Sequence, residues 1–262
     1  MEDARSDQND KTAGIVIIGN EVLSGKVQDT NSPFLLRELY EQGVRVLRVV
    51  TIPDDVPTIA DEVRAASARF DFVLTSGGVG PTHDDLTFEG IARAFDVPLR
   101  EDPTLKALLE RHFAGRLTPA ALRMAMVPSG TRLVRGGDMR YPLCVVRNVY
   151  VFPGVPEILR AKFQVVRHEL QGTPFLQVRI FTQQKETALA ASLEATLDRV
   201  PGVTIGSYPS YDTREYRVML TLESHDAHQL QEARDILLSL LDGSQVVGVD
   251  DPSEITRTPG EP

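Results

Sequence analysis

Cysteine is nearly missing from this chain of 262 residues, which contains only Cys144. A single cysteine excludes an internal disulfide. Cys144 lies in the apolar run Pro142-Leu-Cys-Val-Val146, which is typical of a small core residue rather than of a nucleophile. We therefore expect Cys144 to have a packing role.

Long apolar runs are also missing, and none reaches the length of a transmembrane helix. The start of the chain, Met1-Glu-Asp-Ala-Arg-Ser-Asp7, has neither the basic segment nor the apolar core of a signal peptide. These absences predict a cytoplasmic protein without a membrane partner.

Clusters of basic residues do not occur, and the net charge is −9. A protein of this charge has no electrostatic attraction for the phosphate backbone of DNA or RNA. The composition therefore excludes a nucleic-acid partner but leaves open whether the chain forms a homo-oligomer.

Several catalytic motifs are missing as well. The chain has no Gly-x-Ser-x-Gly elbow, no complete phosphate-binding loop of the Gly-x-x-x-x-Gly-Lys-Ser/Thr type and no dinucleotide-binding glycine fingerprint. Its five histidines form no ligand set, although His83 lies beside the glycine-rich segment described below. An α/β-hydrolase, a P-loop enzyme and a nicotinamide-binding enzyme are all disfavoured.

The first 171 residues have the pattern of an α/β domain. Residues 1–11 are polar and are expected to be disordered. From residue 12 to residue 171, apolar runs alternate with helical patterns, which predicts a mostly parallel, doubly wound sheet. One further strand is expected over 145–152, paired with residues 131–134.

Residues 172–248 follow a different pattern. The expected order is strand, helix, strand, strand, helix, which suggests a small α+β domain of ferredoxin-like type. In its first helix, Leu189, Leu193 and Leu197 are predicted to face inward. Residues 249–262 are expected to be a flexible tail, and the whole second domain is expected to be accessory.

The most informative segment is Ser76-Gly-Gly-Val-Gly-Pro-Thr-His-Asp-Asp85. It follows a predicted strand and precedes a helix for which Thr87 is the predicted N-cap. Glycines at such a turn let backbone N–H groups approach an anion, and the helix N-terminus favours negative charge. The alternative is a tight turn with two solvated aspartates.

Acidic and small polar residues follow several predicted strands: Asn20 and Glu21, the pair Asp54 and Asp55, the pair Asp84 and Asp85, and Glu157. In an open α/β sheet the ligand crevice lies at the carboxyl edge of the strands, where these residues would meet. Oxygen ligands indicate magnesium, manganese or a similar hard cation rather than structural zinc. The alternative is that these loops are acidic only because they are solvated.

Five motifs together resemble the molybdopterin-binding domain family. They are Gly19-Asn-Glu21-Val-Leu-Ser-Gly25, Asp29-Thr-Asn31, Pro53-Asp54, the segment 76–85, and Pro153-Gly-Val-Pro-Glu157. The family includes molybdenum-cofactor adenylyltransferases and the N-terminal domains of competence/damage-inducible protein A and of eukaryotic FAD synthase. The runs Arg140-Tyr-Pro-Leu143, Arg147-Asn-Val-Tyr150 and Gly206-Ser-Tyr-Pro209 are most similar to the FAD synthase branch.

The resemblance implies a three-layer α/β/α fold and a phosphate-bearing ligand, either a dinucleotide or molybdopterin. It implies a divalent cation (Mg, Mn or Co, with K as a further candidate) at Asp54 and Asp85, and catalytic roles for Asp54, Asp84 and Asp85. The residues expected to bind the ligand are Gly19, Asn20, Glu21, Asn31, Ser76, Gly77, Gly78, Gly80, Pro81, Thr82, Pro153, Gly154 and Glu157.

The leading functional hypothesis is a metal-dependent pyrophosphatase of FAD or ADP-ribose, as in some relatives. The chain has Met139-Arg-Tyr-Pro-Leu143 where the competence branch has a Gly-Thr-Ala-Pro-Gly loop, which favours a flavin-type dinucleotide or simple binding. The alternative from another class is a non-catalytic molybdopterin- or nucleotide-binding module. Pterin adenylylation would need an ATP site that the sequence does not reveal.

Overall fold

The computed structural model describes residues 11–114, 116–137, 141–211 and 215–251. The chain folds as two compact units, Met1–Thr173 and Pro174–Pro262. The predicted disorder of residues 1–11 is wrong at Lys11, whose carbonyl accepts the backbone N–H of Arg45 and whose ammonium pairs with Asp71. Residues 1–10, Met139 and Arg140 of the loop compared with the competence branch, and residues 252–262 of the predicted tail lie outside the described residues. Within the described residues, no helix has the length and apolar character that crossing a bilayer requires.

The first unit is built on a six-stranded sheet in the order β2-β1-β3-β8-β7-β6. Four neighbouring strands are parallel, and β7 is antiparallel to both of its neighbours. The strands are β1 (Thr12–Ile18), β2 (Arg45–Ile52), β3 (Phe72–Ser76), β6 (Arg132–Val134), β7 (Leu143–Val146) and β8 (Val149–Phe152). The expected mostly parallel α/β sheet is thus confirmed.

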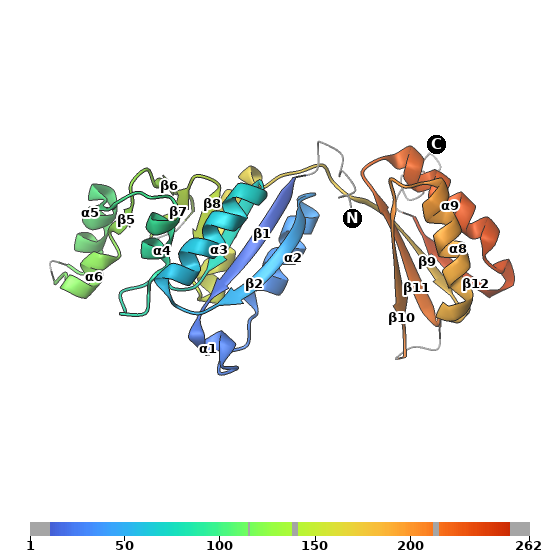
Figure 1. Ribbon diagram of the computed structural model, residues 1–262, viewed down its shortest axis with the longest axis horizontal. Coiled ribbons are helices and arrows are strands. Elements are labelled where there is room, and N and C mark those ends of the chain that lie inside the picture. The colour runs from blue at the N-terminus through green and yellow to red at the C-terminus, as the bar shows by residue number, and fades with distance from the viewer. Residues whose placement is uncertain (1–10, 115, 138–140, 212–214, 252–262) are drawn as a thin grey trace, which may run out of the picture. The chain divides into compact units, whose positions relative to one another are not determined.

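Helices cover both faces of this sheet (Figure 1). α3 and α4 pack on one face, and α2 and α7 pack on the other. The helices of the first unit are α1 (Asn20–Leu23), α2 (Asn31–Glu41), α3 (Val56–Arg69), α4 (Thr87–Ala94), α5 (Pro103–His112), α6 (Pro119–Arg123) and α7 (Pro156–Val166), followed by the 3₁₀ turn η1 (Arg167–Glu169). A separate two-stranded ribbon pairs β4 (Leu99–Glu101) with β5 (Met126–Pro128).

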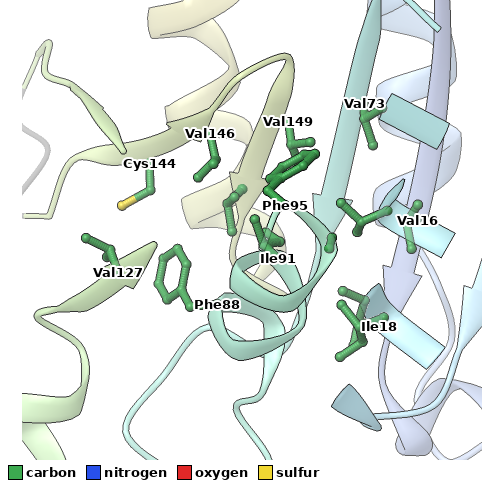
Figure 2. Packing of buried hydrophobic residues seen from close by; sticks show 14 of the residues in the cluster. Val16, Ile18, Val73, Phe88, Ile91, Phe95, Val127, Cys144, Val146 and Val149 are labelled. Carbon is green, nitrogen blue, oxygen red and sulfur yellow. The ribbon is translucent and has the colours of Figure 1, made fainter. Parts of the chain in front are cut away.

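The two cores are built from alternate residues of the same strands. In β1, Val16 and Ile18 face the α3–α4 core, whereas Ile15 and Ile17 face the α2–α7 core. Figure 2 shows the first of these cores, where Phe88, Ile91 and Phe95 of the α4 segment lie against the sheet. Cys144 is 1% exposed and belongs to this core, as expected from its apolar sequence context.

Local capping explains where several helices begin. The Asp55 carboxylate accepts a hydrogen bond from the backbone N–H of Thr58 at the start of α3, and Pro57 lies in the first turn. Asp102 caps α5 in the same way. The predicted cap of α4 is wrong: Thr87 is the first helical residue, and its hydroxyl donates to the Gly77 carbonyl instead.

The predicted strand over 145–152 is a hairpin rather than one strand. β7 and β8 are joined by Arg147 and Asn148, and Arg147 has a positive φ of 55°. The Asn148 amide donates to the carbonyls of Ser67 and Phe70, and its oxygen accepts from the Ser67 hydroxyl. An asparagine held in this way stabilises the turn inside what reads as a continuous apolar run. The expected pairing of residues 131–134 with this segment occurs between β6 and β7.

The second unit has one four-stranded antiparallel sheet in the order β10-β11-β9-β12. Its elements are β9 (Leu176–Thr182), α8 (Glu186–Arg199), β10 (Thr204–Pro209), β11 (Val218–Ser224), α9 (Ala227–Leu240), the 3₁₀ turn η2 (Gly243–Gln245) and β12 (Val246–Asp250). This βαββαβ order with β9 and β11 in the centre is the ferredoxin-like arrangement that the sequence suggested.

Two details of the second unit differ from the sequence interpretation. The expected flexible tail from residue 249 is wrong at its start, because β12 pairs with β9 as far as Asp250 and Asp251 is buried beside Arg234. The predicted inward face of α8 is also wrong near the C-terminal end of the helix. Leu189 is buried, but Leu197 is 37% exposed, and Thr196 is buried in its place.

Candidate functional site

The sheet reverses its winding direction between β1 and β3. α2, which follows β1, packs on one face of the sheet, and α4, which follows β3, packs on the other. The chain therefore leaves these two adjacent strands in opposite directions. Open α/β sheets bind ligands in a crevice at such a point, so the crevice of this sheet is defined by the carboxyl ends of β1 and β3. The predicted segments Gly19–Glu21 and Ser76–Asp85 both start at this crevice.

Asn31 joins three of these segments. Its side-chain amide donates to Ser76 Oγ at 2.9 Å and to the Gly154 carbonyl at 2.8 Å. Asn31 and Ser76 are both buried. The structure thus brings together the ends of β3 and β8 and the start of α2, which are far apart in the sequence. Because both amide hydrogens of Asn31 are engaged within the protein, this side chain organises the crevice and does not donate to a phosphate.

Backbone hydrogen bonds hold the glycine-rich segment in place. Gly77 donates to the Phe152 carbonyl at 3.2 Å, and Thr87 N–H donates to the Gly78 carbonyl at 3.1 Å. Gly77 has a φ of 110°, and a Cβ there would lie 2.0 Å from the Ile18 carbonyl oxygen. Only glycine fits where the turn passes so close to the end of β1.

The two aspartates that follow this segment share one partner. Thr82 donates its backbone N–H to Asp85 Oδ2 at 2.7 Å, and its hydroxyl lies within hydrogen-bond distance of both Asp84 and Asp85. The hydrogen bond from Thr82 lowers the pKa of the Asp84 carboxyl. Both aspartates therefore have an oxygen within hydrogen-bond distance of one hydroxyl.

Asp54 lies just after the end of β2. Its carboxylate accepts the backbone N–H of Asn20 at 2.8 Å, which ties the end of β2 to the start of α1. Partial burial raises the pKa of Asp54, and the charges of Glu21 and Asp84 raise it further, although the Asn20 hydrogen bond opposes them. Asp54 therefore lies in the negative field of two other predicted site residues.

A cavity of about 250 Å³ adjoins the glycine-rich segment. Gly78, Gly80, Thr82 and Asp85 line one wall. The other walls carry apolar, aromatic and sulfur-containing side chains and four charged or titratable groups, which are His83, Glu89, Arg123 and Tyr141. The remaining lining residues are Val79, His83, Leu86, Phe88, Glu89, Leu99, Arg123, Met124, Met126 and Tyr141.

The far wall of this cavity was not predicted from the sequence. Arg123 ends α6, and its guanidinium donates to the Pro81 carbonyl at 2.6 Å. The Tyr141 hydroxyl donates to the Met124 carbonyl, and the Lys162 ammonium, which is 5% exposed, donates to the Pro142 carbonyl at 2.8 Å. The only advance sign of this wall is the Tyr-Pro-Leu run at Tyr141.

The predicted residues thus separate into groups. Ser76, Asn31, Pro153 and Gly154 form the floor of the crevice, because Ser76 Oγ also lies 3.4 Å from the Pro153 carbonyl. Gly19, Asn20, Glu21 and Asp54 follow the ends of β1 and β2 and do not line the cavity, whereas Gly78, Gly80, Thr82 and Asp85 line it. Glu157 is exposed in the first turn of α7, and no hydrogen bond or ion pair of the described structure joins it to the other predicted residues.

Carboxylate oxygens of Asp54 and Asp85 are chemically suited to a hard divalent cation. Within the described residues, however, three or more His, Cys, Asp or Glu side chains nowhere gather closely enough to hold a metal ion by themselves. Magnesium is commonly held by one or two carboxylates together with the phosphates of a ligand. The donor set therefore fits a cation that binds together with a phosphate-bearing ligand.

Each of the two units matches a known protein family. Residues 14–172 match the family described as a probable molybdopterin binding domain, and residues 174–250 match the middle domain of FAD synthase. A probable FAD synthase of Caenorhabditis elegans is 33% identical over 89% of this chain and 50% of its own length. A CinA-like protein of Myxococcus xanthus is 31% identical over 90% of this chain and 60% of its own length.

The chain therefore spans about half the length of the FAD synthase relative. Among solved structures, the protein CinA from Thermoplasma acidophilum superposes with a TM-score of 0.58 at 33% identity, covering 62% of this chain and 99% of that one. These matches agree with the fold of the two units. The chain belongs to the molybdopterin-binding domain family.

Proposed function

We propose that this chain binds a phosphate-bearing nucleotide or pterin at the carboxyl edge of its sheet and hydrolyses a nucleotide pyrophosphate, such as FAD or ADP-ribose, with a divalent cation. The observation that carries the proposal is the two-sided cavity. In this cavity of about 250 Å³, a glycine-rich turn with a threonine and an aspartate faces apolar and aromatic side chains. Pockets for small ligands typically combine an apolar lining with a few directed polar groups.

The two kinds of wall suit the two parts of such a ligand. Backbone N–H groups around Gly78 and Gly80 and the Thr82 hydroxyl would hold phosphate oxygens. Met124, Met126 and Tyr141 offer soft or flat surfaces against which a planar ring can pack. The ligand's phosphates would then lie over the glycine-rich turn and its ring beneath α6.

Asp54 and Asp85 would hold the divalent cation together with the ligand phosphates. When bound, that cation would offset negative charge on the phosphates and lower the pKa of a water molecule. Water adds to one phosphorus, the P–O–P bond breaks, and two monophosphates leave. The proton that the water loses would pass to the solvent, because the Asp54 and Asp85 carboxylates would be engaged with the cation.

The rival function is a binding module without chemistry. Its support is that the described residues contain no preformed cluster of three metal-ligating side chains. In such a module the turn and the cavity would bind the same class of ligand, and Asp54, Asp84 and Asp85 would set only its affinity.

Two experiments separate these functions. The pure protein is incubated with FAD or ADP-ribose and with cobalt, manganese or magnesium, and the release of AMP is followed. Calorimetric titration of the same ligands is then run in EDTA and in excess metal. The hydrolase predicts AMP release and a coupling between ligand and metal of about 1–3 kcal/mol, the usual range for linked sites. Binding without AMP and without coupling would favour the module.

A further inference from the structure

Arg123 is the cation of the ligand cavity that no sequence motif pointed to. It is the last residue of α6 and lines the cavity together with Thr82 and Asp85. Its Nη2 donates to the Pro81 carbonyl, so the guanidinium lies against the glycine-rich turn. α6 and this turn are 42 residues apart in the sequence, and the fold brings them together.

The guanidinium retains most of its hydrogen-bonding capacity. An arginine side chain has five N–H donors, and the described structure engages one of them, at Pro81. No described carboxylate lies within ion-pair distance of Arg123. Most of its donors, and its full positive charge, are thus free to meet a ligand.

The backbone around Arg123 is fixed at two points. The Thr118 hydroxyl accepts the backbone N–H of Ala121 at 3.2 Å and caps α6. The Tyr141 hydroxyl donates to the carbonyl of Met124, the residue that follows Arg123. A donor whose backbone and whose head group are both held loses little conformational entropy when a ligand binds.

The positive charge of Arg123 offsets the negative charge around the cavity. The protein has a net charge of −9, and Asp85 and Glu89 line the cavity while Asp84 lies beside it. An anionic ligand is repelled by all of these groups. A guanidinium beside the glycine-rich turn offsets that repulsion and suits two oxygens of one phosphate, because its planar fork matches phosphate geometry.

We propose that Arg123 is the phosphate-recognition residue of this cavity and that it selects ligands with a phosphate over the matching nucleoside. This proposal rests on the proposed function, because it assigns a role at the same site. Arg123 would contact a phosphate group that the glycine-rich turn holds from the other side. The selectivity arises because a neutral ligand gains nothing from the guanidinium.

The test uses the full chain and four variants. Affinities for inorganic pyrophosphate, FAD and riboflavin are measured by calorimetry in EDTA, so that FAD is not hydrolysed, for the wild type, Arg123→Ala, Arg123→Gln, Arg123→Lys and Arg111→Ala. Arg111 is the matched control, since it is an exposed arginine of α5 whose Nε donates only to the Ala107 carbonyl. Riboflavin serves as the ligand without phosphate.

We expect Arg123→Ala and Arg123→Gln to weaken pyrophosphate and FAD at least tenfold, as the loss of a charged hydrogen bond does. Arg123→Lys should lie in between, because a lysine keeps the charge but not the planar fork. Arg111→Ala should match the wild type, and the affinity for riboflavin should not change in any variant.

The outcomes separate this inference from the proposed function. Equal pyrophosphate and FAD affinities in the wild type and Arg123→Gln would overturn the role of Arg123 and leave the proposed function standing. A wild type that binds neither FAD nor ADP-ribose would overturn the proposed function itself. If Arg123→Ala melts at a lower temperature than the wild type, Arg123→Gln decides, because glutamine can still donate to the Pro81 carbonyl without a charge. An equal loss of riboflavin affinity would also overturn the proposal.

Discussion

The Asn31 amide donates to the Ser76 hydroxyl at 2.9 Å and so connects the start of α2 to the end of β3 across 45 residues of sequence. The same amide reaches Gly154 at the end of β8. One side chain therefore sets the spacing of three segments at the floor of the crevice.

Replacing Asn31 by alanine should lower the free energy of unfolding by about 1–3 kcal/mol, because the buried Ser76 hydroxyl and Gly154 carbonyl lose a donor. Urea unfolding measures this loss. Asn20→Ala is the control, since Asn20 is exposed and its backbone rather than its side chain binds Asp54. Equal losses in the two variants would contradict the spacing role of Asn31.

Gly77→Ala should destabilise the protein far more than Gly25→Ala. Both glycines have a positive φ, 110° and 71°. A Cβ at Gly77 would meet the Ile18 carbonyl oxygen at 2.0 Å, whereas a Cβ at Gly25 would have nothing within 4 Å. The Gly25 variant should cost about 1 kcal/mol, as an alanine forced into the left-handed region does. Comparable melting temperatures for the two variants would show that the turn can move away from β1.

Asp85→Asn should be nearly silent in folding and severe in activity. The asparagine oxygen can still accept the Thr82 N–H, which Asp85 Oδ2 accepts at 2.7 Å. Removing one of several like charges relieves their repulsion, and the melting temperature of the ligand-free protein should stay constant or rise. The turnover number for AMP release tests the expected loss of activity. A turnover equal to that of the wild type would remove Asp85 from the mechanism.

Lys162 should make stability rise with pH in the mildly alkaline range. Burial lowers the pKa of its ammonium to about 8, whereas an unfolded lysine titrates near pH 10.4. Between these values the unfolded chain binds more protons, so the free energy of unfolding rises with pH. Burial raises the pKa of Cys144 to about 12, which acts in the opposite direction above about pH 8.5.

The effect of Lys162 is therefore measured as a difference. Urea unfolding from pH 7.5 to 9.5 is compared for the wild type and Lys162→Met, which both keep Cys144. The wild type should gain about 1 kcal/mol relative to the variant over this range. Parallel pH profiles would show that Lys162 does not lose its proton there.

The second unit should be dispensable for ligand binding. Each unit has its own hydrophobic core, and residues 171–175 between them have no regular secondary structure. Limited proteolysis in this segment should release a fragment ending near Thr173 that still binds FAD or ADP-ribose. A fragment that melts cooperatively but no longer binds either ligand would show that the second unit contributes to the site.

The sheet could be predicted because its strands are apolar on both faces, as in Ile15 to Ile18. The hairpin at Arg147 and Asn148 could not, because its turn depends on contacts of Asn148 with α3 and the residue after it. β12 was missed because a five-residue strand containing a glycine has little signal without its partner β9.

The two walls of the cavity also differ in whether the sequence predicts them. Its glycine-rich wall could be predicted, because glycines, a threonine and aspartates follow a strand directly. The opposite wall could not, because Arg123, Met124 and Tyr141 come from short or irregular segments. Those segments are held at the cavity by tertiary contacts, which are the pairing of β4 with β5, the Tyr141 hydrogen bond to Met124 and the Arg123 hydrogen bond to Pro81.

The central place of β1 has a consequence for how the site moves. β1 lies between β2 and β3 and is buried from Ala13 to Ile18, whereas α1, which follows it directly, has no buried residue. Amide hydrogens of β1 will exchange with solvent only when the first unit opens globally, while those of α1 will exchange through small local openings. The site thus combines slowly exchanging amides in β1 with rapidly exchanging amides in α1, and ligand binding will be visible as slowed exchange in α1 and in the glycine-rich turn rather than in β1.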